Sequence, residues 1–148
     1  MLQMVYWSRP AFSLDRVTLA REIRAVLDAS RKNNRPLQIT GVLAFSKDWF
    51  LQVLEGPSNH VLGVFEKIAL DRRHREIMVL GRRERAVRDF PVWDMAFVPA
   101  TSGNARLIKT FCGSDDLDPR TMAPERLFEL MRELVNRNAK VSVTPLTV

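Results

Sequence analysis

Gln52 is the residue whose chemistry fits its predicted surroundings least well. It lies in the segment WFLQVL at residues 49–54, where strand alternation places it on one face between Phe50 and Leu54. A primary amide has several hydrogen-bonding positions, and each group left unpaired in an apolar interior costs about 1–3 kcal/mol. The amide therefore lies on a partly exposed face, pairs with a nearby backbone group, or is a buried polar contact for a ligand.

Tyr6 offers a partner for this amide. It shares one strand face with Leu2 and Met4, and a lone buried tyrosine usually belongs to the core with its hydroxyl satisfied. The first strand of the topology predicted below commonly lies centrally, beside the strand that carries Gln52. The sequence leaves two interpretations open, a plain core tyrosine and a tyrosine within reach of Gln52.

The rest of the sequence holds no recognisable catalytic or metal-binding constellation. It lacks the GxSxG, HExxH, P-loop and GxGxxG patterns. His60 and His74 are too few and too isolated for a metal cage or an acid-base pair. The single cysteine, Cys112, can form no internal disulfide. We therefore expect neither an enzyme nor a metal site.

The elements that must position Tyr6 and Gln52 follow from the hydrophobic periodicity. Alternating or short apolar runs predict strands, and stripes at i, i+3, i+4 spacing predict helices. The order β-α-β-β-α-β-β is that of a ferredoxin-like α+β sandwich, with two helices on one face of a mixed, mainly antiparallel, five-stranded sheet. The predicted strands are residues 1–6, 39–46, 49–54, 77–80 and 93–98, and the predicted helices are 17–32 and the segment capped by Ser58.

The last part of the chain is predicted to be helical. Residues 1–98 contain all the predicted strands, and residues 99–148 form a C-terminal helical extension. In this extension, Leu127 to Val135 form an apolar stripe behind Pro124, a favoured residue at a helix start. Such a stripe must be buried, either on the open face of the sheet or against a second subunit.

The net charge of +6 raises the question of a nucleic-acid partner. The densest basic cluster, Arg82, Arg83, Arg85 and Arg88, lies in a predicted loop without interleaved aromatics on which bases could stack. A solvated surface is favoured over a polyanion site, with an acidic protein partner as the alternative. The sequence has neither a secretory signal nor an apolar run of the roughly 20 residues that cross a bilayer, so we expect a cytoplasmic protein without a membrane partner.

Four segments together resemble the BLUF family, the sensors of blue light using FAD. They are MVYWSR, SRKNNRPLQITGVLAFS, WFLQVLEGP, and DRRHREI with FPVWDMAF. The middle pair is the most specific, because a helix end in NN followed by ITGVL and FLQVLEG at this spacing rarely arises by accident. The resemblance covers about residue 2 to 98 and implies the fold predicted above, with residues 1–98 as a flavin-binding sensor domain.

The resemblance implies that the isoalloxazine ring of a flavin lies between the two helices, sandwiched by Val26 and Ile68. Gln52 would lie between Tyr6 and the N5/C4=O edge of the flavin, which accounts for an amide among apolar residues. Asn34 would hydrogen-bond the C4 carbonyl edge, and its neighbour Asn33 is a further cofactor-binding position. The other matching positions are Phe50 near the ring, Lys67, Asp71, Arg73 and His74 toward the pyrimidine or dinucleotide end, and Trp93 and Met95 on the last strand.

The resemblance also implies a light reaction without substrate turnover. Excited flavin would take an electron and then a proton from Tyr6, and during recombination the Gln52 amide would rotate or tautomerise and give the flavin C4=O a stronger hydrogen bond. We expect the readout to pass through Trp93 and Met95 to residues 104–140, and then to an unidentified signalling protein or to a homo-oligomer. The implied cofactor is FAD, with FMN not excluded. Val53 stands where some members carry tryptophan, which removes no photochemical group.

Three competing hypotheses remain open at this point. A flavin-free ferredoxin-like interaction module would be colourless when purified. A small ferredoxin-like enzyme such as an acylphosphatase needs an arginine cradle, and the loop around Ser8, Arg9 and Pro10 offers none. A nucleic-acid binder would show a strongly salt-dependent affinity. An absorption spectrum separates the photoreceptor from all three.

Overall fold

The structure, a computed structural model, describes residues 1–12, 15–46, 48–90, 95–99, 105–113 and 118–138. Five strands form one sheet in the order β4-β1-β3-β2-β5. The β2–β5 pair is parallel and the other neighbours are antiparallel. The elements are β1 (Leu2–Pro10), α1 (Arg16–Asn34), η1 (Arg35–Leu37), β2 (Thr40–Ser46), β3 (Trp49–Gly56), α2 (Ser58–Ala69), β4 (His74–Glu84), β5 (Ala96–Pro99), α3 (Ala105–Cys112), η3 (Pro119–Thr121) and α4 (Pro124–Asn138).

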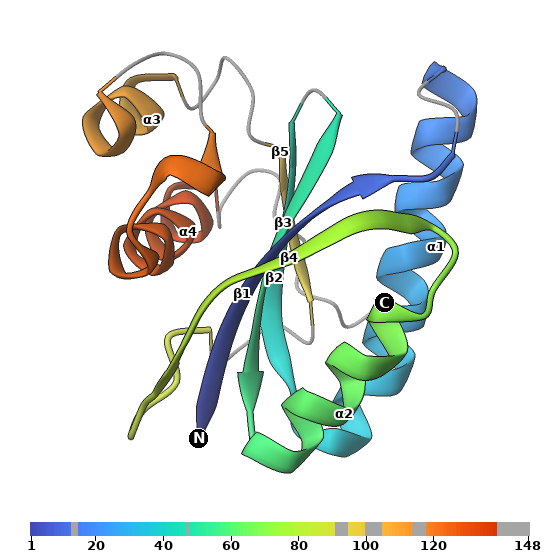
Figure 1. The fold of residues 1–148 in the computed structure, drawn as a ribbon, viewed down its shortest axis with the longest axis horizontal. Coiled ribbons are helices and arrows are strands. Elements are labelled where there is room, and N and C mark those ends of the chain that lie inside the picture. The colour runs from blue at the N-terminus through green and yellow to red at the C-terminus, as the bar shows by residue number, and fades with distance from the viewer. Residues whose placement is uncertain (13–14, 47, 91–94, 100–104, 114–117, 139–148) are drawn as a thin grey trace.

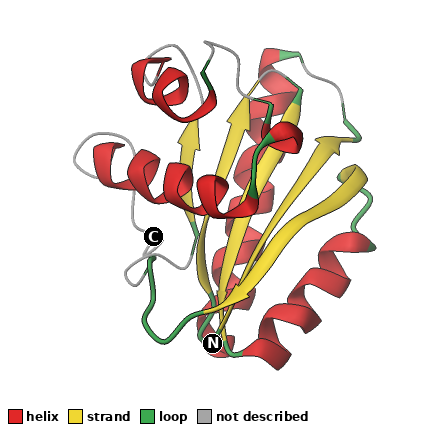
Figure 2. Ribbon diagram, turned by 60° about the vertical axis from the view of Figure 1, so that its left-hand side comes forward, coloured by secondary structure: helices red, strands yellow, loops and turns green. Residues whose placement is uncertain are grey.

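The sheet is the middle of three layers. Helices α1 and α2 lie on one side of it, and α3 and α4 lie on the other (Figures 1 and 2). Every residue of β3 is buried, because both of its faces are covered. The ferredoxin-like α+β fold predicted from the sequence is confirmed, with two helices on one face of a mixed five-stranded sheet.

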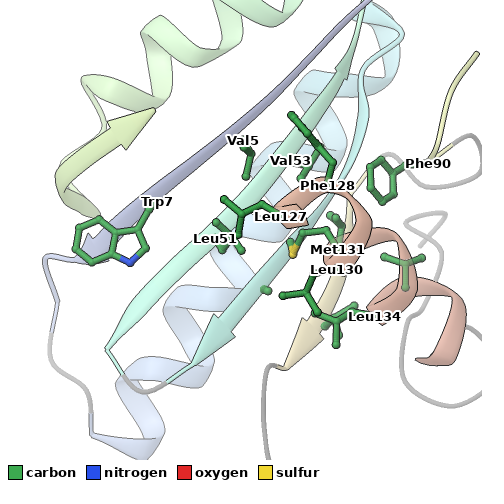
Figure 3. Close-up of a cluster of buried hydrophobic side chains, with 14 of the residues drawn as sticks. Val5, Trp7, Leu51, Val53, Phe90, Leu127, Phe128, Leu130, Met131 and Leu134 are labelled. Carbon is green, nitrogen blue, oxygen red and sulfur yellow. The ribbon is translucent and has the colours of Figure 1, made fainter. Parts of the chain in front are cut away.

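Strand alternation divides the interior into two cores. Met4, Tyr6, Phe50 and Leu54 point toward α1 and α2. Their sequence neighbours on β1 and β3 point to the face that α4 covers, as Figure 3 shows for Val5, Leu51 and Val53, and Trp7 belongs to the same core. The apolar stripe of the C-terminal helix, which includes Leu127, Leu130, Met131, Leu134 and Val135, is buried in this second core. Of the two predicted burial sites for the stripe, the structure therefore has the open face of the sheet.

Three strands are longer than the sequence predicted, and β3 ends at Gly56 and not at residue 54. β1 continues to Pro10, which pairs with His74 at the edge of the sheet. A proline at a strand end is tolerated, because no ladder hydrogen bond from its nitrogen is needed there. β4 runs through Glu84, so Arg82 and Arg83 belong to a strand and not to the predicted loop. The hydrophobic periodicity did not predict the extension of β4, because β4 is an edge strand that bears many exposed charged side chains.

The helices that flank the site begin with different caps. Asp15 caps α1 by accepting a hydrogen bond of 3.0 Å from the backbone nitrogen of Thr18. The N-cap of α2 is Pro57 and not Ser58, which is already the first helical residue. The carbonyl of Pro57 accepts from the backbone nitrogens of His60 and Val61, each at 3.0 Å, so the turn closes without a side-chain cap.

Candidate functional site

A cavity of about 380 Å³ opens between α1, α2 and the sheet. Its floor is formed by Tyr6 of β1 and Gln52 of β3. Both helices supply apolar wall residues, and cationic side chains join them. The remaining lining residues are Val26, Ala29, Ser30, Lys32, Asn33, Pro36, Leu37, Val64, Lys67, Ile68, Asp71, Arg73 and His74.

Tyr6 and Gln52 are directly opposite each other in the antiparallel β1–β3 ladder. The Tyr6 hydroxyl donates a hydrogen bond to Gln52 Oε1, and the exposed fractions of the two residues are 1% and 2%. Burial, together with the nearby carboxylate of Asp71, raises the pKa of the Tyr6 phenol. The phenol is therefore neutral at neutral pH and keeps the proton with which it donates to Gln52. Of the three interpretations of Gln52, partial exposure and local backbone pairing give way to a buried amide with a side-chain partner.

The other end of the Gln52 amide faces a sulfur atom. Gln52 Nε2 donates to Met95 Sδ at 3.1 Å, and Met95 is fully buried just before β5. A thioether is a weak acceptor, so the amide is held strongly at its oxygen and weakly at its nitrogen. Trp93, the other residue predicted to act on the last strand, lies outside the described residues.

A polar cluster lies beside this pair. Arg73 Nη2 donates to Asp71 Oδ2 at 2.6 Å. The hydrogen bonds from the side chain and backbone of Arg73 hold the pKa of Asp71 below its usual range. His74 Nδ1 lies 2.9 Å from the hydroxyl of Ser8. Burial lowers the pKa of His74, so the ring is neutral at neutral pH. The site thus combines a neutral floor with charged groups farther along the wall.

The structure brings most of the predicted site residues together. Those that line the cavity are Tyr6, Val26, Asn33, Gln52, Lys67, Ile68, Asp71, Arg73 and His74. Asn34 and Phe50 are buried but are not among the residues that line the cavity. Phe50 packs against His74 with ring centroids 5.6 Å apart. Both residues remain predictions as cofactor contacts.

Some wall residues were missed by the sequence reasoning. Ala29 and Ser30 lie on the cavity wall three and four residues after Val26, and Val64 lies four residues before Ile68. Helical spacing places residues three and four apart on one face, so Val26 and Ile68 could have identified them. Lys32, Pro36 and Leu37 are further wall residues that were not predicted, and the turn η1 carries the last two.

The arrangement suits a flat ligand with one polar edge. Its volume falls within the range of small-molecule sites, which is about 300–1,000 Å³. Apolar side chains of α1 and α2 can cover the two faces of a ring, while Gln52 can reach a polar edge. Lys32, Lys67 and Arg73 can pair with an anionic group attached to it.

Comparison with known proteins identifies the family. The family model described as "BLUF: Sensors of blue-light using FAD" matches residues 1–96. Subunit beta of the photoactivated adenylate cyclase of Euglena longa is 28% identical over 91 residues, which are 61% of this chain and 10% of that protein. The blue light- and temperature-regulated antirepressor BluF of Escherichia coli (strain K12) is 32% identical over 60 residues, 40% of this chain and 15% of that protein.

Solved structures extend the similarity to the C-terminal helices. The ground state of BlsA has a TM-score of 0.80 at 25% identity, with 99% of this chain and 93% of that chain covered. The curated relatives are longer, and this chain spans only 7% to 15% of their length. No helix among the residues described is both long and apolar enough to span a membrane. The chain belongs to the BLUF family of blue-light-sensing flavin photoreceptors.

Proposed function

We propose that this protein senses blue light with an FAD bound between α1 and α2, and that light rearranges the hydrogen bonds of Tyr6, Gln52 and Met95. The observation that carries the proposal is the buried Gln52 amide, which bonds the Tyr6 hydroxyl at one end and Met95 Sδ at the other. A core without a ligand could be filled by apolar side chains and would not require a buried amide. A light-sensitive cofactor above it gives the amide a third neighbour.

The residues around the cavity fit a flavin. Val26 and Ile68 can cover the two faces of the ring, and the Gln52 amide can reach its polar edge. Lys32, Lys67 and Arg73 offer charges to phosphate groups. FAD is favoured over FMN because the family is described by its use of FAD. When bound, the flavin supplies the absorption of blue light and an electron acceptor.

The chain's own residues supply the electron, the proton and the change in hydrogen bonding. Tyr6 keeps its proton in the dark because burial raises its pKa. Once the phenol loses an electron it becomes strongly acidic, and its proton leaves along the hydrogen bond to Gln52 Oε1. The amide then loses its strong partner. Among the described residues, the weak contact with Met95 is then the one side-chain hydrogen bond that opposes its reorientation. The electron and the proton return to Tyr6, and its hydroxyl bonds the amide in the new orientation until the network relaxes in darkness.

We further propose that the output is a change in binding and not substrate turnover. The flavin-binding unit would be residues 1–98, and residues 99–148 would carry the signal to a partner protein or to a second copy of the chain. The packing of α4 on the sheet supports this division, because α4 touches the strands whose other face holds Tyr6 and Gln52. The Escherichia coli relative, described as a light-regulated antirepressor, is compatible with signalling to a partner.

An absorption spectrum before and after a blue flash tests the proposal. We expect a flavin spectrum with a reversible red shift of roughly 10 nm, as a strengthened hydrogen bond to the flavin produces. Gln52→Leu and Tyr6→Phe should bind flavin but lose the shift. Trp7→Phe is the control, because Trp7 follows Tyr6 but points to the opposite face and its indole N–H has no partner among the described residues. A colourless protein that cannot be reconstituted with FAD would leave the interaction module as the better hypothesis.

A further inference from the structure

Glu55 is a buried carboxylate on the face of the sheet opposite to the cavity. It is 0% exposed and lies three residues after Gln52 on β3, so its side chain points toward the α4 side. Glu55 Oε2 accepts a hydrogen bond from Gln3 Nε2 and another, of 2.9 Å, from the backbone nitrogen of Asp89. Glu55 Oε1 accepts from the backbone nitrogen of Phe90 at 3.0 Å. One carboxylate thus holds two consecutive backbone amides.

This arrangement requires two acceptor oxygens. An ionised carboxylate presents only acceptors, whereas a glutamine presents one oxygen and one NH2 donor. With glutamine at position 55, an NH2 group would face one of the two backbone N–H groups, and a buried donor would lose its partner. Burial of a carboxylate is costly unless it is well bonded, so its presence here indicates that fixing Asp89 and Phe90 matters to this fold.

Asp89 and Phe90 join the segment after β4 to the core beneath α4. The Asp89 carboxylate accepts from Gln3 Nε2 at 2.7 Å and from Arg85 Nη2 at 3.1 Å. It also lies 3.9 Å from Arg132 of α4. The Phe90 ring is buried in the same core as α4, and Figure 3 shows it beside this helix. These contacts hold the backbone and the ring of Phe90 in place against the core beneath α4.

Five residues beyond Phe90 the chain reaches Met95, which contacts the other face of the sheet. Met95 belongs to the core that lines α1 and α2, and its sulfur accepts the Gln52 Nε2 hydrogen bond at 3.1 Å. Glu55 and Gln52 are three residues apart on β3. Glu55 bonds the backbone at Phe90 and Gln52 bonds Met95, two positions only five residues apart in the sequence but on opposite faces of the sheet.

We infer that Glu55 is a positioning residue for the light response, and that it sets the place of Met95 against Gln52 by fixing the backbone amides of Asp89 and Phe90. The inference rests on the proposed function and adds to it a residue that touches neither Tyr6 nor Gln52. Met95 is the partner of the Gln52 nitrogen in the dark orientation. When Glu55 releases Phe90, that orientation loses support and the return to it slows.

The test compares Glu55→Gln, Met95→Leu and their combination, with Glu125→Gln as the control. Glu125 undergoes the same chemical change but lies exposed on α4, where it pairs with Arg83. We expect Glu55→Gln to slow dark recovery of the red shift by about threefold to tenfold, the factor set by one hydrogen bond of ordinary strength. The double variant should recover like Met95→Leu alone, because both changes remove the same contact. Additive effects, or an equal effect of Glu125→Gln, would overturn the inference.

A second readout needs no flavin. In protein with labelled methionine methyl groups, the Met95 signal is the one that Met95→Leu removes. We expect Glu55→Gln to move this NMR signal and to leave that of Met122 in place, since Met122 contacts Cys112. A Met95 signal that does not move overturns the inference even when the wild-type protein shows a normal red shift. A wild type without any red shift refutes the proposed function, while a moved Met95 signal still supports the link from Glu55 to Met95.

The reverse experiment applies if Glu55→Gln does not fold. Coupling between two positions is reciprocal in free energy, so Met95→Ala should weaken the hold of Glu55 on Phe90. We expect faster hydrogen exchange at the Phe90 amide in Met95→Ala than in wild type, with unchanged exchange at the Val61 amide of α2. Equal protection of the Phe90 amide in the two proteins would show that Glu55 has only a structural role.

Discussion

The two faces of one sheet pack against different helices. On the α4 side, which we call the closed face, side chains of β1 and β3 pack against Leu127, Leu130 and Met131, which are all fully buried (Figure 3). On the side of α1 and α2, the same strands border a cavity of about 380 Å³. The polar pair Tyr6 and Gln52 belongs to the side with the cavity. Strand alternation thus separates the closed face from the face that borders the cavity, which we call the cavity face.

The division has a consequence for stability. Protein interiors are packed as densely as organic crystals, and contacts that a void removes are lost outright. A side chain enclosed on all sides therefore contributes more to the folding free energy than a partly exposed one does. Substitutions on the closed face should cost stability, whereas those around the cavity should mainly change ligand binding.

The largest expected effect is on the closed face. Leu130→Ala should lower the free energy of unfolding by about 2–5 kcal/mol, because a fully buried leucine leaves a new cavity. Leu37→Ala on the cavity wall is the matched control, and its loss should be clearly smaller because Leu37 is only partly buried. Urea denaturation of both variants measures the difference. Equal losses would mean that the two faces contribute alike.

Binding of FAD in the cavity should raise the free energy of unfolding. At a free FAD concentration of 100 times the Kd, the free energy of unfolding should rise by about 2.7 kcal/mol, since only the folded chain binds the ligand. Thermal unfolding with and without FAD measures this rise. Ala29→Trp places a large ring in the cavity from α1 and should abolish the stabilisation. If FAD stabilises Ala29→Trp as much as wild type, the flavin binds elsewhere.

Much of this two-sided arrangement could be predicted from the sequence. Strand alternation placed Tyr6 and Gln52 on one face, and the order of elements placed their strands side by side, as the β1–β3 register shows. The contact of Gln52 with Met95 could not be derived from pattern alone, because it depends on where the chain lies just before a strand that pairs in parallel with β2. Only the resemblance to the family pointed to Met95.

The burial of Glu55 and the length of β4 could not be predicted, because charged residues in such segments ordinarily belong to solvated turns or loops. Glu55 precedes Gly56 and Pro57, where a charged residue is ordinarily a solvated turn residue. Its burial becomes evident only when the backbone of Asp89 and Phe90, distant in sequence, is placed against it. The charged side chains of β4 likewise resemble those of a loop, although they belong to an exposed edge strand. Long-range backbone contacts leave little trace in local sequence.

The smallest predicted effect distinguishes the two faces by pH. Burial lowers the pKa of His74, on the cavity face, below the 6.5 of a free histidine. The unfolded chain therefore binds a proton more readily than the folded one, so stability falls as the pH drops below about 6.5 and levels off below the folded pKa. On the closed face, burial would raise the pKa of Asp89, but hydrogen bonds from Gln3 and Arg85 outweigh it and hold the pKa below 3.8. The contribution of Asp89 is thus lost only at lower pH.

Urea denaturation at pH 7.5 and at pH 5.5 isolates the contribution of His74. His74→Phe should lose less stability than wild type between these two pH values, because it has no imidazole to protonate. Leu130→Ala, although far less stable at both, should keep the wild-type pH dependence, since its change lies on the other face. His74 Nδ1 lies 2.9 Å from the Ser8 hydroxyl on β1, so the structural change on protonation should centre on β1 near Tyr6. A pH dependence that is unchanged in His74→Phe would mean that its imidazole is as readily protonated in the folded chain as in the unfolded one.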